Sequence, residues 1–132
     1  MTGAGSAQGL IRSILRIVVG FTFSCHGWQK LFGMFGGLQG HSAHFPHLLW
    51  FAGIIETVGG ALILLGLFTS PAAFILCGEM AVAYFMGHYP HGFFPIQNHG
   101  ELAVVYCFVF LYLFVAGPGP ISLDRLFRRK SA

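Results

Sequence analysis

The sequence predicts an all-α fold, an integral membrane bundle of four transmembrane helices. Of its 132 residues 55% are hydrophobic and 8% are charged, whereas charged residues make up about 25% of an ordinary soluble domain. The apolar residues form continuous runs without the alternation of a membrane barrel strand, and helices satisfy their own backbone hydrogen bonds in lipid. This composition excludes a disordered chain, and the scattered cysteines exclude a disulfide-stapled secreted fold.

Four apolar stretches make up the predicted bundle, which is a single domain covering residues 1–132. Each stretch is close to the roughly 20 residues that a helix needs to cross the hydrocarbon core. The predicted helices cover residues 11–35, 46–68, 71–88 and 98–116. Ser70 precedes Pro71 and is expected to be the N-cap of the third helix. The spacing of Asn98 and Glu101 predicts a capping box at the start of the fourth.

Basic residues predict the orientation in the membrane. Arg12 and Arg16 flank the first span, and Arg16 is expected to extend its side chain to the cytoplasmic interface. The tail at 121–132 is rich in arginine and is expected to lie on the inner membrane face as an amphipathic helix capped by Ser122. The positive-inside rule then places both termini in the cytoplasm. Because the basic residues gather at the membrane surface, the lipid bilayer is an expected partner and nucleic acid is not.

Three ionisable residues are predicted to share one depth in the bilayer. His26, Glu56 and Glu79 each lie about nine or ten residues from the expected outer end of their helix, which corresponds to about 14 Å at 1.5 Å per residue. That depth is near the middle of a hydrocarbon core of about 30 Å, where an ionisable group costs roughly 2.5 to 3.5 kcal/mol. We therefore predict a proton-exchanging pocket with these three residues as its candidate catalytic groups.

Two features favour a counter-charge for the carboxylate of Glu56. Lys30 shares a helix face with His26, one turn nearer the outside. Glu56 itself lies between Gly53 and Gly60 on a small-residue face that lets a neighbouring helix approach closely. The alternative is purely structural, because a pair between Glu56 and either His26 or Lys30 could serve only to lock the bundle.

The outer loops contribute further candidates for binding. Phe93 and Phe94 beside an outer opening would suit an aromatic headgroup such as a quinone, and Glu101 would act there as a gate unless it only caps its helix. Histidines recur in both outer loops, in an H-x-x-H-x-x-H pattern at 41–47 and an H-x-x-H pattern at 88–91. Such loop histidines without acidic or thiol companions are typical of a wetted interface, so no metal site is predicted.

The cysteines are interpreted as packing residues. No C-x-x-C motif occurs, and Cys25, Cys77 and Cys107 lie in separate apolar runs. Free cysteine commonly behaves as a small buried hydrophobe. Cys77 and Cys107 are therefore expected to be small core residues, and the chain is expected to lack a cysteine pair for thiol chemistry.

Several spaced motifs lie between about residues 10 and 125. The segments are His26-Gly27-Trp28-Gln29-Lys30-Leu31, Glu56-Thr57-Val58-Gly59-Gly60, Leu65-Gly66-Leu67-Phe68-Thr69, Glu79-Met80-Ala81-Val82-Ala83-Tyr84, Gly100-Glu101-Leu102-Ala103 and Gly117-Pro118-Gly119-Pro120-Ile121-Ser122-Leu123-Asp124. In this order they resemble the DoxX family of small four-helix membrane proteins. Ser70 departs from the family pattern, because many members carry arginine there. The family is named for a membrane subunit associated with an archaeal thiosulfate:quinone oxidoreductase, and other members are linked to membrane complexes that handle oxidative or thiol stress.

The resemblance implies a multi-pass, redox-associated subunit of the bacterial inner membrane and leaves open whether the chain is an enzyme. In a quinone-linked oxidoreductase, His26 and Glu56 would exchange protons and Lys30 would hold an anionic intermediate. No haem, flavin or iron–sulfur motif is visible, so electrons would come from a redox protein partner or a small donor. Two alternatives remain: a scaffold that recruits a soluble redox enzyme, and a small proton or solute transporter, which would require a homo-oligomer.

Overall fold

The computed structural model describes residues 3–45 and 47–131 and is built from helices. Within those ranges the structure has no β-strand, only an isolated bridge between Leu38 and His41. Three helical segments are long and apolar enough to cross a membrane, namely Gly5–Phe32, Leu48–Leu65 and Thr69–His91. The apolar helix Glu101–Ala116 is shorter. The all-helical membrane architecture is confirmed, and the bundle of four spanning helices stays a prediction.

The chain forms two compact units, which are described separately. The first unit comprises Met1–Thr69 and Pro118–Ala132, and the second comprises Ser70–Gly117. The termini Met1 and Ala132, and the expected start of the second helix at Pro46, lie outside the described residues.

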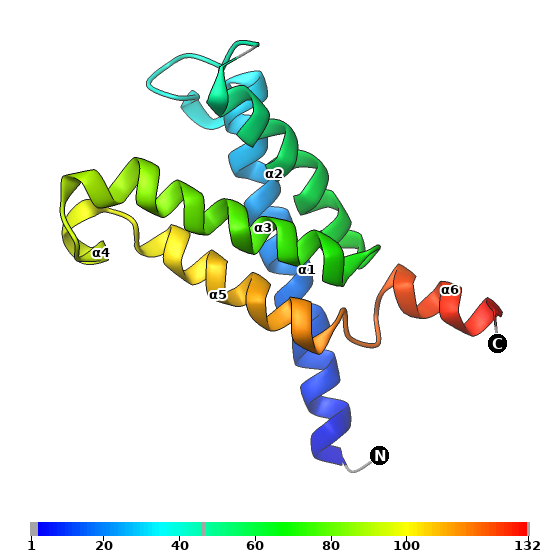
Figure 1. The fold of residues 1–132 in the computed structure, drawn as a ribbon. Coiled ribbons are helices and arrows are strands. Elements are labelled where there is room, and N and C mark those ends of the chain that lie inside the picture. Colours follow the sequence, from blue (N-terminus) through cyan, green and yellow to red (C-terminus); the bar gives the residue numbers. More distant parts are fainter. Residues whose placement is uncertain (1–2, 46, 132) are drawn as a thin grey trace. The chain divides into compact units, whose positions relative to one another are not determined.

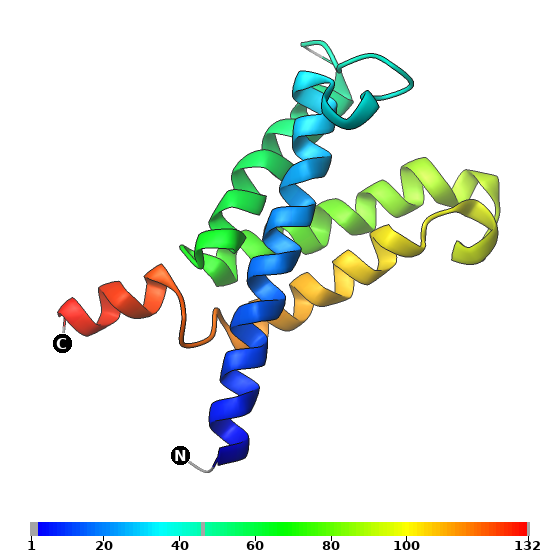
Figure 2. The same cartoon turned by 180° about the vertical axis from the view of Figure 1, so that it is seen from behind.

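In the first unit, α1 (Gly3–Phe32) and α2 (Leu48–Leu65) form a hairpin and lie side by side in both ribbon views (Figures 1 and 2). α1 begins before residue 11, where the first helix was predicted to start. It ends at Phe32 because Gly33 adopts a left-handed conformation with φ of 67°. α2 begins after His47, whose side chain accepts a hydrogen bond from the Leu49 N–H at 3.2 Å.

Glycines hold the two helices of the hairpin in close contact. A Cβ atom added at Gly27 of α1 would lie 2.6 Å from the backbone nitrogen of Thr57. A Cβ atom added at Gly60 of α2 would lie 3.0 Å from the backbone nitrogen of Ser24. The first distance is shorter than real Cβ contacts and the second is tighter than most of them, so glycine at these positions allows the close approach. The small-residue face predicted for the second helix is thus confirmed as a helix contact surface.

The C-terminal segment of the first unit ends in α6 (Leu123–Ser131), which runs away from the hairpin in both views (Figures 1 and 2, red). Ser122 caps it as predicted, since its hydroxyl accepts a hydrogen bond from the Arg125 N–H at 3.3 Å. On a helix of 3.6 residues per turn, Leu123 and Phe127 lie on the side opposite the arginines. α6 is therefore the basic amphipathic helix predicted for the tail.

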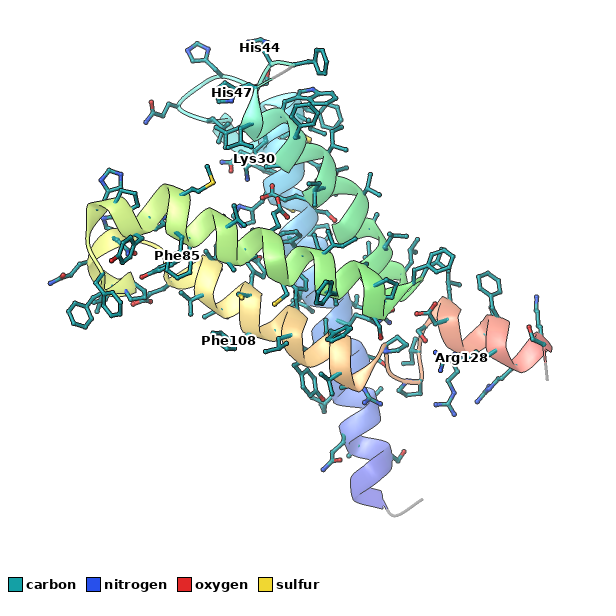
Figure 3. All side chains as sticks on the ribbon, in the orientation of Figure 1. Lys30, His44, His47, Phe85, Phe108 and Arg128 are labelled. Atoms are coloured by element: carbon teal, nitrogen blue, oxygen red, sulfur yellow. The ribbon has the colours of Figure 1, made fainter. Side chains whose placement is uncertain are left out.

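The second unit contains a long helical segment and a shorter antiparallel one. α3 (Thr69–Ala83) continues through a π-helical turn (Tyr84–His88) and a 3-10 turn (Tyr89–His91). A short α4 (Pro95–Asn98) precedes α5 (Glu101–Ala116). α3 and α5 lie side by side in both views (Figures 1 and 2). Figure 3 labels one exposed aromatic residue on each arm of this unit, Phe85 and Phe108.

Both predicted caps in this part of the chain are wrong. The third helix begins at Thr69, before the predicted cap Ser70. The fourth begins at Glu101, because His99 has a left-handed conformation with φ of 61° that separates α4 from α5. Asn98 is instead the last residue of α4, and its side chain accepts a hydrogen bond from the Gly100 N–H at 2.8 Å.

Candidate functional site

The α1–α2 hairpin contains a buried ion pair between Lys30 and Glu56. The Lys30 Nζ atom donates to both carboxylate oxygens of Glu56, at 2.7 Å and 3.0 Å. The Glu56 side chain is 4% exposed, whereas the Lys30 side chain is 15% exposed. The carboxylate of Glu56 is therefore shielded almost completely, and the ammonium group of Lys30 is the more accessible part of the pair.

The position of the pair follows from the local sequence. Lys30 occupies the last turn of α1, where a cation interacts favourably with the helix dipole. Its backbone carbonyl accepts a hydrogen bond from the Ala43 N–H at 2.6 Å, so the loop between the two helices folds back onto the end of α1. Figure 3 shows Lys30 near this loop end of the hairpin, with His44 and His47 farther out.

The sequence allowed two partners for Glu56, and the structure pairs it with Lys30. His26 lies four residues before Lys30 on the same face of α1 and is half-buried. A proton-exchanging pair of His26 and Glu56 stays a prediction. The alternative of a purely structural pair also stays open, since Lys30 and Glu56 join two neighbouring helices.

The other predicted site residues lie in the second unit. Glu79 is on α3 and has both carboxylate oxygens buried. Glu101 is exposed in the first turn of α5. Phe93 and Phe94 are exposed in the loop before α4 and contact each other edge to face, with ring centroids 5.3 Å apart. The pocket shared by Glu79 with His26 and Glu56, and the roles of these three outer residues, stay predictions.

Sequence reasoning missed a polar cluster that fixes the loop between α3 and α5 in the second unit. Asn98 is 3% exposed, and its side-chain amide donates to the Gly92 carbonyl at 2.8 Å and to the Tyr84 hydroxyl at 3.1 Å. The Tyr84 hydroxyl donates to the Phe93 carbonyl at 2.5 Å. His88 Nδ1 lies 3.1 Å from the Asn98 carbonyl oxygen. These bonds hold the backbone beside Phe93 in a fixed conformation.

The prediction for Arg16 is wrong, because its side chain does not extend to the interface. Arg16 is 1% exposed and donates to the carbonyls of Ile63 and Leu64 at 2.6 Å each and of Pro118 at 2.8 Å. A further bond goes to the carbonyl of Ile121. The planar guanidinium satisfies carbonyls from two chain segments at once, which keeps this charge inside the protein.

Asp124 supplies the cap that sequence reasoning assigned to Ser70. Its two carboxylate oxygens accept from the Phe68 N–H at 2.8 Å and the Thr69 N–H at 3.0 Å, at the start of α3. The Asp124 N–H donates to the Gly66 carbonyl at 2.9 Å. A carboxylate at a helix N-terminus is stabilised by the free N–H groups and the helix dipole. The G-P-G-P-I-S-L-D motif therefore fastens the C-terminal segment to the end of the hairpin.

Two of the cysteines, which the sequence places in separate apolar runs, are in contact in the structure, and the expected lack of a pair for thiol chemistry stays a prediction. Cys77 on α3 and Cys107 on α5 bring their Sγ atoms to 3.7 Å. All three cysteines are half-buried and free, and Cys25 belongs to the first unit. Within the described ranges, no group of three His, Cys, Asp or Glu side chains could hold a metal ion.

Comparison with known proteins gives the family of this chain. The DoxX family model matches residues 11–89. An uncharacterised protein of Haemophilus influenzae is 46% identical over 125 residues, covering 89% of this chain and 91% of the relative. The inner membrane protein YphA of Escherichia coli is 31% identical over 130 residues, covering 92% of this chain and 93% of the relative. No solved structure matches the chain significantly. The family match spans the α1–α2 hairpin with its Lys30–Glu56 pair, and the chain belongs to the DoxX family of membrane proteins.

Proposed function

We propose that this protein is a multi-pass inner-membrane subunit of a quinone-linked oxidoreductase, and that Lys30 and Glu56 bind the quinone headgroup. The observation that carries the proposal is the buried Lys30–Glu56 pair inside an apolar hairpin. Its location is supported by the relative YphA, whose name describes an inner membrane protein. The resemblance to a family with quinone-linked members supplies the reaction class.

The energetic argument favours a functional pair. Desolvating two charges is costly, and well-packed apolar residues of similar size often give equal or greater stability. Ionisable residues within membrane-spanning segments are accordingly rare and commonly mark ligand or proton pathways. Lys30 and Glu56 both lie within candidate spans. A pair retained at this cost is better explained by chemistry than by architecture alone.

The donor set fits a quinone headgroup, whose two carbonyl oxygens accept hydrogen bonds. An ammonium group has three donors, and Lys30 donates to the two oxygens of Glu56. One N–H therefore remains for a headgroup oxygen on the more exposed side of the pair. When bound, a quinone accepts two electrons and two protons. Lys30 would orient it, Glu56 would hold a proton beside it, and His26 would pass protons along the same face of α1.

The proposal is tested by quinone binding to variants of the pair. The protein is reconstituted into nanodiscs and titrated with decylubiquinone, and binding is followed by quenching of Trp28 and Trp50 fluorescence. The double variant Lys30→Gln/Glu56→Gln is uncharged but keeps hydrogen-bonding groups on both helices. Loss of the charged hydrogen bonds should weaken binding roughly 10-fold or more.

The control variant is Arg125→Gln, which changes an exposed residue of α6 and should bind as the wild type does. A helical circular dichroism spectrum confirms that the double variant is folded. Binding of decylubiquinone by the folded double variant with wild-type affinity would contradict the proposal.

A second candidate function, a scaffold that recruits a soluble redox enzyme, is favoured by α6. The basic residues of this helix are all exposed; they are Arg125, Arg128, Arg129 and Lys130. Arg128 is labelled on α6 in Figure 3. If the scaffold function is correct, a soluble redox enzyme should co-purify with the wild type in mild detergent. Replacing all four basic residues with glutamine should abolish this co-purification, while decylubiquinone binding should be absent from both proteins.

A further inference from the structure

Two cysteines that are distant in the sequence meet in the second unit. Cys77 and Cys107 are separated by the whole outer loop, yet their Sγ atoms are 3.7 Å apart. The S–S length of a disulfide is about 2.05 Å, so the two sulfur atoms are not bonded. They are in van der Waals contact, close enough for a disulfide to form between them. They come from neighbouring helices, α3 and α5.

Contacts on both sides of the thiols fix them in this position. Toward the start of α3, Phe74 packs against Phe114 with ring centroids 5.2 Å apart. Toward the other end, Asn98 bonds to Tyr84 at 3.1 Å and closes the outer loop. These two contacts therefore fix the register of α3 against α5 on both sides of the thiols. Two sulfur atoms held in contact react with an effective concentration far above that of free thiols in solution.

The apolar surroundings of the thiols favour an oxidant that dissolves in the bilayer. Cys77 and Cys107 are each half-buried, Cys77 in a helical segment long and apolar enough to cross a membrane and Cys107 in the shorter apolar helix α5. The exposed residues Phe74, three positions before Cys77, and Phe108, directly after Cys107, are apolar, at 60% and 63% exposure. An oxidant dissolved in the bilayer can reach thiols in such apolar surroundings, as can a small uncharged reagent that partitions into the membrane.

We propose that Cys77 and Cys107 form a redox-active dithiol that is oxidised to an inter-helix disulfide by a quinone dissolved in the bilayer. Two S–H bonds break and one S–S bond forms. Two electrons and two protons pass to the two carbonyl oxygens of the quinone, which leaves as the quinol. A low-molecular-weight dithiol restores the pair by thiol–disulfide exchange and becomes a disulfide itself.

This inference rests on the proposed function only for the identity of the oxidant. Formation of the disulfide is a property of α3 and α5 alone, whereas the Lys30–Glu56 pair belongs to the first unit. The two proposals therefore fail in different experiments. A quinone that oxidises the dithiol in the Lys30→Gln/Glu56→Gln variant would support the dithiol while contradicting a headgroup site at the ion pair.

The test counts reactive thiols in the reduced protein in nanodiscs before and after oxidation. One sample receives decylubiquinone, a second receives the membrane-permeant oxidant diamide, and a third receives neither. N-ethylmaleimide then alkylates the remaining thiols under denaturing conditions, and intact mass reports their number. Alkylation should fall from three thiols to one, and peptide mapping should identify the alkylated residue as Cys25.

Variants of single cysteines complete the design. Cys25→Ser should lose both alkylated thiols on oxidation, whereas Cys77→Ser and Cys107→Ser should each keep two. Three alkylated thiols after both oxidants, or a disulfide that includes Cys25 or joins two chains, would overturn the dithiol. Oxidation by diamide without oxidation by decylubiquinone would overturn the assignment of a quinone as oxidant.

Discussion

The guanidinium of Arg16 donates a 2.6 Å hydrogen bond to the backbone carbonyl of Ile63, in the last turn of the neighbouring helix. Carbonyls at a helix C-terminus lack partners within the helix, and a cation there also interacts favourably with the helix dipole. Arg16 thus acts as a C-terminal cap that α1 supplies to α2. Arg16 also donates to the Pro118 carbonyl and thereby connects α1, the end of α2 and the C-terminal segment of the first unit.

We expect Arg16→Gln to destabilise the protein by about 3 kcal/mol, because several carbonyls lose a charged donor in a buried position. Arg16→Lys should recover only part of this loss, since an ammonium group cannot reproduce the planar fork. The measurement is unfolding in mild detergent on titration with SDS, followed by circular dichroism. Arg125→Lys on exposed α6 is the control and should change stability little. An Arg16→Lys variant as stable as the wild type would show that the fork geometry is unimportant.

Gly27→Ala should destabilise the α1–α2 hairpin by roughly 1 to 3 kcal/mol. The added methyl group would meet the backbone of Thr57 at 2.6 Å, and backbone cannot move aside as a flexible side chain can. Gly78→Ala is the matched control on α3, because no atom lies within 4 Å of its added methyl group. Alanine also favours helix, so this control should be neutral or slightly stabilising. Equal stability of the two variants would contradict the glycine-mediated contact.

The orientation of the chain is tested by cysteine labelling from the two membrane faces. In a background with the three native cysteines replaced by serine, Ser42→Cys and Ser131→Cys are compared. An impermeant maleimide added to intact cells stripped of their outer membrane should label Ser42→Cys, whereas Ser131→Cys should react only after lysis. This result follows from the basic flanks of the first and last helices. Labelling of both positions from the same face would contradict the predicted topology.

The depth of α6 is tested by tryptophan fluorescence in a background with Trp28 and Trp50 replaced by phenylalanine. Phe127→Trp places the probe on the apolar face of α6, and Arg128→Trp places it about 100° away on the basic face. Lipids brominated near the headgroup should quench Phe127→Trp much more strongly than Arg128→Trp, because an amphipathic helix buries its apolar face about 5 to 10 Å into the interface. Equal quenching would show that α6 does not lie on the membrane.

Local sequence patterns predicted those features that depend on neighbouring residues. The small-residue face around Glu56 was recognisable because three or four residues separate neighbours on a helix, and the same spacing placed Lys30 and His26 together. Ser122 was recognisable as a cap from its place after the G-P-G-P segment. These features are determined by residues that lie within one or two helical turns of one another in the sequence.

Features that depend on distant segments escaped sequence reasoning. The start of α3 is set by Asp124, 55 residues after Thr69, and no local signal at Ser70 reveals this. Arg16 looked like an interfacial residue because its carbonyl partners belong to two other segments. The meeting of Cys77 and Cys107 depends on the register of two helices, which spacing in the sequence does not encode.

The contacts of Arg16 also set an order of events during synthesis. The ribosome completes Arg16, Ile63 and Leu64 long before Pro118 and Ile121, which supply the other carbonyls. While translation continues, the inserted hairpin holds a guanidinium whose hydrogen bonds are only partly formed inside the protein. The last segment to leave the ribosome completes them. A chain truncated before Pro118 would lack two of the carbonyl acceptors of Arg16, and we expect it to be less stable than the finished protein.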